Sequence, residues 1–590
     1  MTTSRSTFLY ILLVLLLFSL PFTITSSATT EAEALVKWKM NLSSASFLDS
    51  WSILNLGNLC NWTSIVCNAG LSGTLDQLDF TSFPSLTSFC LNGNNFRGSI
   101  PSNIGNTSML TFLDLSNNIL EGVIPEEIGK LTQLEYLSFY GNEIIGVIPY
   151  QISNLQKEYA YVDYLSFGFN ELRLEFPEFV FHCHNLTYLD LSINHLNGSI
   201  PETLFTNLDK LEHLNLSSNS FQGSLSPNFT KLTKLKELQF GVNMFSGIIP
   251  DEIGLVSSLE VVVLFNNSLQ GKIPSSIGKL RNLQQLDLGK NRLSSTIPSE
   301  LGLCTNLIFL ALAENILQGP LPISLSAVTK LSELSLSDNF LSGEVQSYLI
   351  TNWTELTSLL LQNNSFSGKI PPEISQLKNL VYLYLFRNNF TGSIPYQIGK
   401  LQNLLELDVS DNRLSGTIPP TIGNLTNIRA LHLFRNNISG TIPSEIGKLT
   451  SLQTLNLNTN RFSGELPDSI SNLGSLKLLE FLSLSNNQFS ETNYTISALD
   501  EQESNSEFLN DFWKAALMGY GSGLCIGLSI IYFMISTRTP KWLARIMEEL
   551  EHKIIMQSRK KQRGSYVAKI EEMRRTESEE LSFIELQTVK

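Results

Sequence analysis

Residues 110–125 read LTFLDLSNNILEGVIP, and this pattern recurs along most of the chain. Leucines stand at intervals of two or three residues, an asparagine follows them, and Gly-x-Ile-Pro closes the unit. Counted by the asparagine, seventeen copies occur, and most are 24 residues apart: Asn94, Asn118, Asn142, Asn170, Asn194, Asn219, Asn243, Asn267, Asn291, Asn315, Asn339, Asn364, Asn388, Asn412, Asn436, Asn460 and Asn487. A period of this length indicates a solenoid of stacked repeats.

Each part of the repeat has a physical role. Leucines that alternate along a short strand point inward, and the asparagine amide can bond turn backbone groups that would otherwise be buried unpaired. Proline fixes its own backbone and disfavours helix at the preceding residue, so Gly-x-Ile-Pro predicts a second extended element beside each strand. The sequence therefore predicts an α/β solenoid, and the repeat resembles the plant-type leucine-rich-repeat (LRR) superhelix.

The boundaries of the solenoid are irregular. We place about 17 repeats in residues 84–490, with longer spacings after Asn142 and after Asn460. Residues 29–83 form an N-terminal cap and a partial first repeat, in which Ala34, Leu35, Trp38 and Met40 predict an amphipathic helix. Residues 70–75 give only the second half of a repeat, so the usual first strand is expected to be missing, and no cysteine pair follows Asn487 to form a C-terminal cap.

Six cysteines in 590 residues exclude a scaffold built on disulfides. The segment Cys60-Asn61-Trp62-Thr63-Ser64-Ile65-Val66-Cys67 resembles the N-terminal cap of plant LRR receptors, which implies a disulfide between Cys60 and Cys67. Cys183 and Cys304 each lie three residues before a repeat leucine, where a small buried thiol fits.

The two ends of the chain predict a single-pass membrane protein. Residues 1–28 have the features of a signal peptide, and residues 515–537 are 23 uncharged residues, long enough to span a bilayer. The preceding segment, 491–514, is acidic. The following tail, 538–590, carries twelve Lys and Arg against nine Asp and Glu, which places it in the cytoplasm and the repeats outside the plasma membrane.

N-glycosylation acceptors agree with that topology, because none lies beyond the span. An asparagine-rich repeat also generates such acceptors by composition. The acceptors that we take as candidates are Asn61, Asn106, Asn185, Asn215, Asn352 and Asn424. The net charge of −14 argues against a nucleic-acid partner.

Two resemblances refine the hypothesis. Residues 508–523 (FLNDFWKAALMGYGSG), and the similarity that continues to Arg563, resemble the C-terminus of Cf-type plant receptor-like proteins of disease resistance. The repeats instead resemble LRR receptor kinases of the male-discoverer-interacting group, through Phe83-Pro84-Ser85-Leu86 and Asn352-Trp353-Thr354-Glu355-Leu356. The first resemblance implies adaptor and co-receptor LRR kinases as partners and a role in plant defence.

The tail of 53 residues is too short for a kinase and contains no kinase motif, and we find no spacing typical of a metal or cofactor site. We therefore expect no enzyme, but a receptor-like protein that recognises an extracellular peptide or pathogen-derived ligand. The alternatives are an LRR inhibitor of cell-wall-degrading enzymes and a truncated or recombined receptor-kinase ectodomain.

The residues two, four and six places before each repeat asparagine should face outward from the concave sheet. Two regions of these positions are aromatic, although aromatic residues also favour strands in general. The first region contains Phe112, Tyr136, Tyr140, Tyr164 and Tyr188. The second, our preferred ligand site, contains Tyr382, Tyr384, Phe386, Glu406, Asp408, His432 and Phe434, in which aromatic rings beside carboxylates suit a peptide with basic or hydroxyl groups.

Gly519, Gly523 and Gly527 are spaced four apart within the predicted span. Glycine is common in membrane helices, but three in register predict a smooth stripe for packing against a partner helix.

Overall fold

The computed structural model describes residues 26–42, 71–156, 162–470, 479 and 481–490. Several predicted features lie outside these residues: the hydrophobic part of the signal peptide, Cys60, Asn61 and Cys67, the span with Gly519, Gly523 and Gly527, and the cytoplasmic tail. The described part of the chain contains no helix long and apolar enough to cross a membrane.

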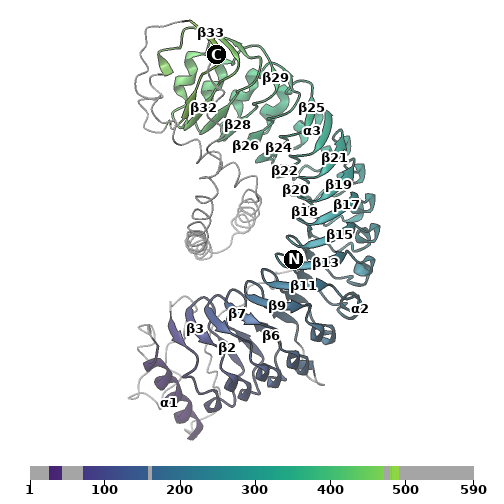
Figure 1. The fold of residues 1–590 in the computed structure, drawn as a ribbon, viewed down its shortest axis with the longest axis vertical. Helices are drawn as coiled ribbons and strands as arrows, with labels where there is room; N and C mark the ends of the chain where they lie inside the picture. Colours follow the sequence, from purple (N-terminus) through teal and green to yellow (C-terminus); the bar gives the residue numbers. More distant parts are fainter. Residues whose placement is uncertain (1–25, 43–70, 157–161, 471–478, 480, 491–590) are drawn as a thin grey trace, which may run out of the picture. The chain divides into compact units, whose positions relative to one another are not determined.

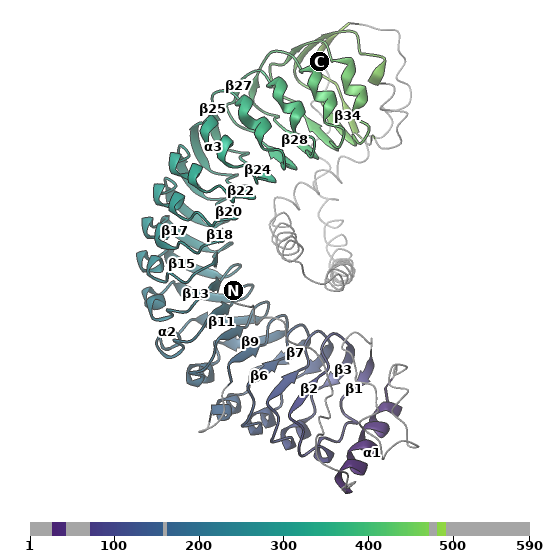
Figure 2. The same ribbon diagram turned by 180° about the vertical axis from the view of Figure 1, so that it is seen from behind.

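The repeats form two parallel sheets joined by short helices, and they stack along a curved path (Figure 1). The first sheet lines the inner side of the curve, whereas the helices lie on the outer side (Figure 2). We call the first sheet the concave sheet and the second the outer sheet. This arrangement confirms both extended elements that the repeat pattern predicts.

The concave sheet has seventeen strands, one for each predicted repeat, paired in sequence order. They are β2 (Ser88–Cys90), β4 (Phe112–Asp114), β6 (Tyr136–Ser138), β8 (Tyr164–Ser166), β10 (Tyr188–Asp190), β12 (His213–Asn215), β14 (Glu237–Gln239), β16 (Val261–Val263), β18 (Gln285–Asp287), β20 (Phe309–Ala311), β22 (Glu333–Ser335), β24 (Ser358–Leu360), β26 (Tyr382–Tyr384), β28 (Glu406–Asp408), β30 (Ala430–His432), β32 (Thr454–Asn456) and β34 (Phe481–Ser483).

The outer sheet runs continuously through thirteen strands and then divides into one pair and one group of three. Its strands are β1 (Ser72–Thr74), β3 (Asn95–Ser99), β5 (Ile119–Gly122), β7 (Glu143–Gly146), β9 (Glu171–Glu175), β11 (His195–Ser199), β13 (Ser220–Ser224), β15 (Met244–Ile248), β17 (Ser268–Lys272), β19 (Arg292–Ser295), β21 (Ile316–Gly319), β23 (Phe340–Glu344), β25 (Ser365–Ser367), β27 (Thr391–Gly392), β29 (Arg413–Leu414), β31 (Ser439–Gly440), β33 (Arg461–Gly464) and β35 (Gln488–Phe489).

Most repeats continue from the outer sheet into a short 3-10 helix. In η11, for example, the fixed φ of Pro274 (−66°) precedes the first helical residue. The helices are α1 (Ser26–Met40), η4 (Phe80–Ser82), η5 (Ser102–Asn106), η6 (Glu126–Lys130), η7 (Tyr150–Gln156), η8 (Glu178–His182), α2 (Thr203–Asn207), η9 (Pro227–Lys231), η10 (Asp251–Leu255), η11 (Ser275–Lys279), η12 (Ser299–Leu303), η13 (Ile323–Ala327), α3 (Ser347–Asn352), η14 (Pro372–Gln376), η15 (Tyr396–Lys400), η16 (Pro420–Asn424) and η17 (Ser444–Lys448).

The repeat asparagine connects one repeat to the one before it. The Asn315 Nδ2 donates to the carbonyls of Leu312 and Ala313 in its own repeat and of Leu288 in the preceding one, at 3.0–3.2 Å. Its Oδ1 accepts the backbone N–H of Leu293, also in the preceding repeat, at 2.9 Å. One buried side chain thus bonds four backbone groups in two repeats. It is the acceptor for the Leu293 N–H, and the three carbonyls each accept a second bond, from Asn291, Asn339 and the Lys290 N–H.

Close packing of the helices explains the glycines of the Ile-Gly pairs. A Cβ placed on Gly254 in η10 would lie 2.2 Å from the backbone oxygen of Ser276 in η11. The repeats can therefore approach each other this closely only without a side chain at this position.

The N-terminal cap is confirmed in part. Helix α1 buries Leu35 and Trp38, and the Trp38 ring stacks on Phe96 with a centroid distance of 5.7 Å while its Nε1 donates to the carbonyl of Thr74. Met40, which we predicted on the same face, is 68% exposed because it lies at the end of the helix. The described residues contain β1 of the outer sheet, the second half of a repeat. Residues 43–70, where a first concave strand would precede it, lie outside the described residues, so the missing strand stays a prediction.

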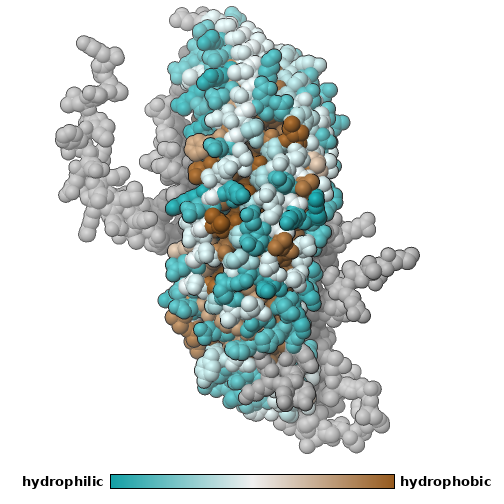
Figure 3. All heavy atoms as spheres, turned by 90° about the vertical axis from the view of Figure 1, so that its right-hand side faces the viewer, coloured by the Kyte–Doolittle hydropathy of each residue, from teal (hydrophilic) through white to brown (hydrophobic). Residues whose placement is uncertain are grey.

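Cys183 and Cys304 are buried as predicted, and burial raises the pKa of the Cys304 thiol to about 11. Cys90, at the end of β2, is also buried. The outer face in Figure 3 carries separate apolar side chains among more hydrophilic ones.

We predict that Asn315→Ala lowers the free energy of unfolding by about 3 kcal/mol, because the buried Leu293 N–H loses its acceptor and three carbonyls each lose one of two bonds. An unpaired buried donor costs about 1–3 kcal/mol and each lost bond about 1 kcal/mol. Asn379→Ala is the matched control, because Asn379 is exposed and makes a single 3.3 Å bond to the Thr354 carbonyl. Urea unfolding followed by circular dichroism measures both. Equal midpoints for the two variants would contradict the role of the asparagine.

Candidate functional site

The candidate site lies on the concave sheet near its C-terminal end. In β26, β28 and β30 the central leucines Leu383, Leu407 and Leu431 are buried, so the residues on either side of each face outward. The strands pair in register, which aligns Tyr384, Asp408 and His432 in one row across the sheet. We call the seven predicted residues Tyr382, Tyr384, Phe386, Glu406, Asp408, His432 and Phe434 the C-terminal cluster.

The aromatic side chains of this cluster pack against one another. The ring centroids of Tyr382 and Tyr384 are 6.3 Å apart, and those of Tyr384 and Phe386 are 6.1 Å apart. His432 and Phe434 form a second pair at 6.3 Å. The structure thus brings the predicted aromatic residues together, and all of them keep part of their surface exposed.

The two carboxylates of the cluster are less available than the sequence suggested. Glu406 accepts a hydrogen bond from the Tyr384 hydroxyl. Asp408 is only 6% exposed, and its Oδ1 accepts the Ser410 backbone N–H at 2.9 Å and the Ser410 hydroxyl at 2.6 Å. Burial raises the pKa of Asp408 to about 6. The expectation that both carboxylates present themselves to a basic ligand does not match this geometry.

His432 lies beside Asp408 in the same row. Its Nδ1 is buried and has no hydrogen-bond partner among the described residues. Burial lowers the pKa of His432, while Glu406 opposes that shift. Because burial disfavours the imidazolium, the ring is neutral near pH 7 and adds no charge to the site.

The charged groups that do reach solvent at this site are arginines that our positional rule missed. Asp411 lies between Arg387 and Arg435, with nitrogen–oxygen distances of 3.8 and 3.5 Å. The arginine side chains are 61% and 63% exposed, whereas that of Asp411 is 22% exposed. All three residues immediately precede a repeat asparagine and have φ near +50°, which turns them out of the strand alternation. The repeated Phe-Arg-Asn-Asn at 386–389 and 434–437 is the signal that could have revealed them.

The first aromatic region has a different geometry. Phe112, Tyr136, Tyr164 and Tyr188 occupy neighbouring strands and stack in sequence, with centroid distances of 4.2–4.3 Å and nearly parallel rings. Tyr140 lies outside this stack, 6.3 Å from Phe169. The ring faces are therefore occupied by neighbouring rings, and each such contact stabilises the fold by about 0.5–1.5 kcal/mol. In the C-terminal cluster the rings meet edge-on or tilted and do not cover one another's faces, and Tyr382 is 36% exposed.

The described glycosylation candidates differ in their surroundings. Asn106, Asn352 and Asn424 are exposed at the ends of η5, α3 and η16. Asn185 is half-buried and accepts a bond from the Lys210 amino group. Asn215 lies on the concave sheet between the two aromatic regions, where its Oδ1 accepts the Ser217 N–H and hydroxyl at 3.1 and 2.6 Å.

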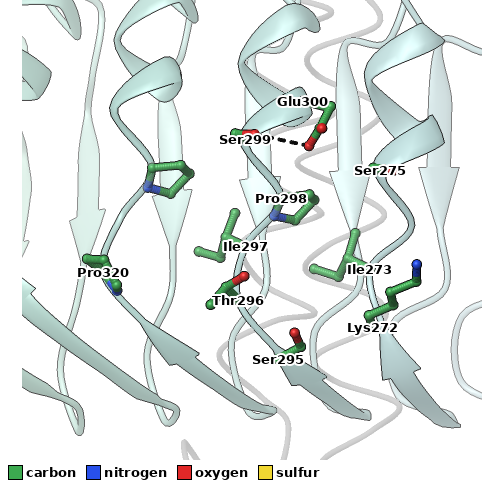
Figure 4. A pocket seen from close by; sticks show the side chains of 11 residues that line it. Lys272, Ile273, Ser275, Ser295, Thr296, Ile297, Pro298, Ser299, Glu300 and Pro320 are labelled. Carbon is green, nitrogen blue, oxygen red and sulfur yellow. Dashed lines mark hydrogen bonds between the residues drawn. The ribbon is translucent and has the colours of Figure 1, made fainter.

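A shallow groove of about 440 Å³ lies on the outer side, between the outer-sheet strands and the 3-10 helices (Figure 4). Ile273, Ile297, Pro298 and Pro320 give it apolar walls, while Lys272 and Glu300 bring opposite charges to its rim. An adjoining groove of about 610 Å³ shares Lys272, Ser275 and Glu300. Neither groove is lined by the C-terminal cluster or by Arg387 and Arg435.

Comparisons with known proteins agree with this architecture. The leucine rich repeat N-terminal domain matches residues 28–68. The Leucine Rich Repeat family matches residues 85–107, 109–131, 133–155, 185–207, 210–232, 258–280, 282–304, 355–377, 379–401, 403–425, 427–449 and 451–473. The LRR ectodomain of the Arabidopsis receptor kinase HAESA, solved with an N-terminally extended IDA peptide hormone, is 32% identical over 79% of this chain and 82% of that one, with a TM-score of 0.66.

The chain belongs to the plant leucine-rich-repeat family of receptor-like proteins and receptor-kinase ectodomains. Among curated proteins, it is 43% identical over 72 residues to the receptor-like protein Cf-9 of Solanum pimpinellifolium, which is 12% of this chain and 8% of Cf-9. It is 33% identical over 115 residues to MDIS1-interacting receptor like kinase 2 of Arabidopsis thaliana, or 17% of this chain and 11% of that kinase. Both resemblances stated from the sequence are thereby confirmed, although each match spans only about a tenth of the relative.

The buried Asp408 predicts a pH dependence of stability. Because its folded-state pKa is raised above 3.8 to about 6, its contribution to stability is complete below pH 4 and is lost as the pH rises through 6. At about 1.4 kcal/mol per pKa unit the loss is at most about 3 kcal/mol. We predict that Asp408→Asn loses less thermal stability than the native chain between pH 4.5 and pH 7.5, because an amide does not titrate in this range. The variant should still fold, since the amide oxygen can accept the Ser410 donors.

The melting temperature at each pH measures this effect, and Asp251→Asn, at an exposed carboxyl on η10, is the control. The same pH-dependent loss in Asp408→Asn as in the native chain would show that Asp408 does not titrate as described.

Proposed function

We propose that this protein is a cell-surface receptor-like protein without a kinase of its own, whose concave sheet binds an extracellular peptide and which signals through a partner kinase. The observation that carries the ligand half of this proposal is the C-terminal cluster with its two exposed arginines. Half-exposed aromatic rings beside arginine are typical of binding hot spots.

The geometry also suggests the chemistry of the ligand. The Glu406 carboxylate accepts a hydrogen bond from Tyr384, and the Asp408 carboxylate accepts one from Ser410. The charge that faces solvent therefore comes mainly from Arg387 and Arg435. We therefore propose a peptide that carries apolar or aromatic side chains and a carboxylate, in place of the peptide with basic or hydroxyl groups expected from the sequence. An arginine pair suits a carboxylate because guanidinium groups bind it with two parallel hydrogen bonds.

Solved relatives support a peptide as the ligand class. HAESA was crystallised with a peptide hormone, and PEPR1, which is 29% identical over 78% of this chain with a TM-score of 0.63, was crystallised with AtPEP1. HAESA has also been solved together with the co-receptor SERK1. For this chain the peptide, the plasma-membrane location and the adaptor and co-receptor kinases are proposals.

The site is tested with peptides selected from a random dodecapeptide library on the full chain, purified in detergent. We predict that Tyr384→Ala combined with Phe386→Ala lowers the affinity for the selected peptides by about 30-fold or more. This is the loss expected when the aromatic anchors of a binding hot spot are removed. Tyr396→Ala is the control, because Tyr396 is 64% exposed on the outer η15. Unchanged affinity in the double variant, or the absence of any selected peptide, would refute the site.

The signalling half of the proposal rests on Gly519, Gly523 and Gly527. Without side chains on one stripe of a membrane helix, two backbones can approach closely and gain packing contacts. Replacing the three glycines with leucine keeps the segment apolar, and we predict that it sharply reduces recovery of adaptor kinases by co-immunoprecipitation at equal surface expression. Gly521→Leu, off the stripe, should leave recovery unchanged. If the triple variant recovers as much kinase as the native chain, the contact lies elsewhere.

A further inference from the structure

Four repeats carry a buried aspartate four residues before the repeat asparagine. Asp114, Asp190, Asp287 and Asp408 are between 2% and 6% exposed. In each, Oδ1 accepts the backbone N–H of the residue two places later, at 2.8–3.0 Å. The four positions therefore share one local geometry and can be compared directly.

Asp287 differs from the other three in its second donor. Serine follows two residues after Asp114, Asp190 and Asp408, and its hydroxyl bonds to the carboxylate. Gly289 stands at that place after Asp287 and has no hydroxyl. Within the described part of the chain, the backbone N–H of Gly289 is the one hydrogen-bond donor to this carboxylate.

The strands on either side offer no compensation. Val263 and Ala311 are the register neighbours of Asp287, whereas Asp190 lies between Ser166 and Asn215, and Asp408 between Tyr384 and His432. No charged side chain shifts the pKa of Asp287, which burial raises to about 7. Asp287 thus has the fewest hydrogen-bond donors of the four buried carboxyl groups.

The fold does not need an aspartate at this position. The equivalent residues of nearby strands are Val263, Ala311 and Leu360, and those strands pair as regularly as β18 does. A buried polar group with incomplete hydrogen bonding destabilises the folded state and calls for an explanation. A ligand that completes the bonding would supply one.

The residues next to Asp287 are small. Gly289 has no side chain and Ala311 and Ala313 carry only a methyl group, whereas the larger Gln285 and Phe309 stand at the first outward position of β18 and β20. A Cβ on Gly289 would lie 3.3 Å from the Asp287 Oδ1 and 3.4 Å from Cδ2 of Phe265, so the Phe265 ring borders Gly289. Because Asp287 is 2% exposed, a ligand group has to enter between these larger side chains to reach the carboxyl group.

We propose that Asp287 is a hydrogen-bonding subsite for the peptide, which receives a side-chain hydroxyl or primary amide of the ligand in place of the serine found in the sister repeats. An uncharged group fits because Val263, Phe265 and Ala311 make the surroundings apolar. A hydroxyl or primary amide can also both donate and accept, which matches a carboxyl group in either protonation state.

This inference rests on the proposed peptide-binding function and extends its site along the sheet. Four strand spacings separate Asp287 from Tyr384, about 19 Å at roughly 4.8 Å per strand. Extended peptide covers that distance in about six residues. A dodecapeptide can therefore occupy both places at once.

The test uses the full chain in detergent and the peptides selected on it from the random dodecapeptide library. Gly289→Ser supplies the missing hydroxyl from within the protein, and Asp287→Ala removes the acceptor. Gly241→Ser is the matched control, because Gly241 occupies the same place in its repeat and its Cβ would be similarly confined, 3.2 Å from Val263, but Gln239 takes the place of the aspartate. Melting temperatures verify that each variant folds.

We expect Gly289→Ser and Asp287→Ala to lower the affinity for the selected peptides at least tenfold. Gly241→Ser should bind them with the affinity of the native chain. Changing the hydroxyl or amide residue of the peptide to alanine should lower the peptide's affinity for the native chain by the same factor. The same change should not lower the affinity for the Gly289→Ser variant any further. If both Asp287 and Gly289 variants bind within twofold of native while Tyr384 and Phe386 still matter, the subsite is wrong and the proposed function stands. If no peptide is selected, or binding ignores both places, both proposals fail.

Discussion

The amide of the repeat asparagine is the interaction on which the rest of the structure depends. Each three-residue concave strand turns into the outer sheet, and without the asparagine one backbone N–H of the turn would be buried without an acceptor. Asn315 bonds three carbonyls and one N–H, two of these groups in its own repeat and two in the preceding one. The same side chain therefore closes a turn and fixes the spacing between repeats, and the leucine core follows from that spacing.

Because the asparagines and the inward leucines hold the fold, the outward positions of the concave sheet are free to vary. Tyrosine, aspartate, histidine and valine all occur there without disturbing the register of the strands. Variation at these positions can therefore serve binding, provided that neighbouring side chains do not satisfy one another. In the stack from Phe112 to Tyr188 they do, since each ring covers the next. Around Tyr384 and Arg387 they leave aromatic and cationic surface available.

Much of the fold could be predicted from the sequence because the repeat acts locally. The spacing of the asparagines predicted seventeen concave strands, and the Ile-Pro pairs predicted the second extended element. Less of the site was predictable, because side-chain alternation says which way a residue faces but not what covers it. The alternation rule placed Asp408 correctly in its row. It did not show that the Asp408 carboxylate is buried and accepts a hydrogen bond from Ser410. It also missed Arg387 and Arg435, whose positive φ lies outside the alternation, and could not distinguish Asp287 from its sister aspartates.

We propose that the concave sheet near Tyr384 is a peptide-binding surface. Hydrogen–deuterium exchange of the full chain, with and without a saturating selected peptide, tests it most directly, because exchange reports protection along the whole backbone. We predict slower exchange in residues 382–387, 406–411 and 430–435, with no change in the stacked region from Phe112 to Tyr188. Protection confined to the outer helices, or to the N-terminal strands, would contradict the account.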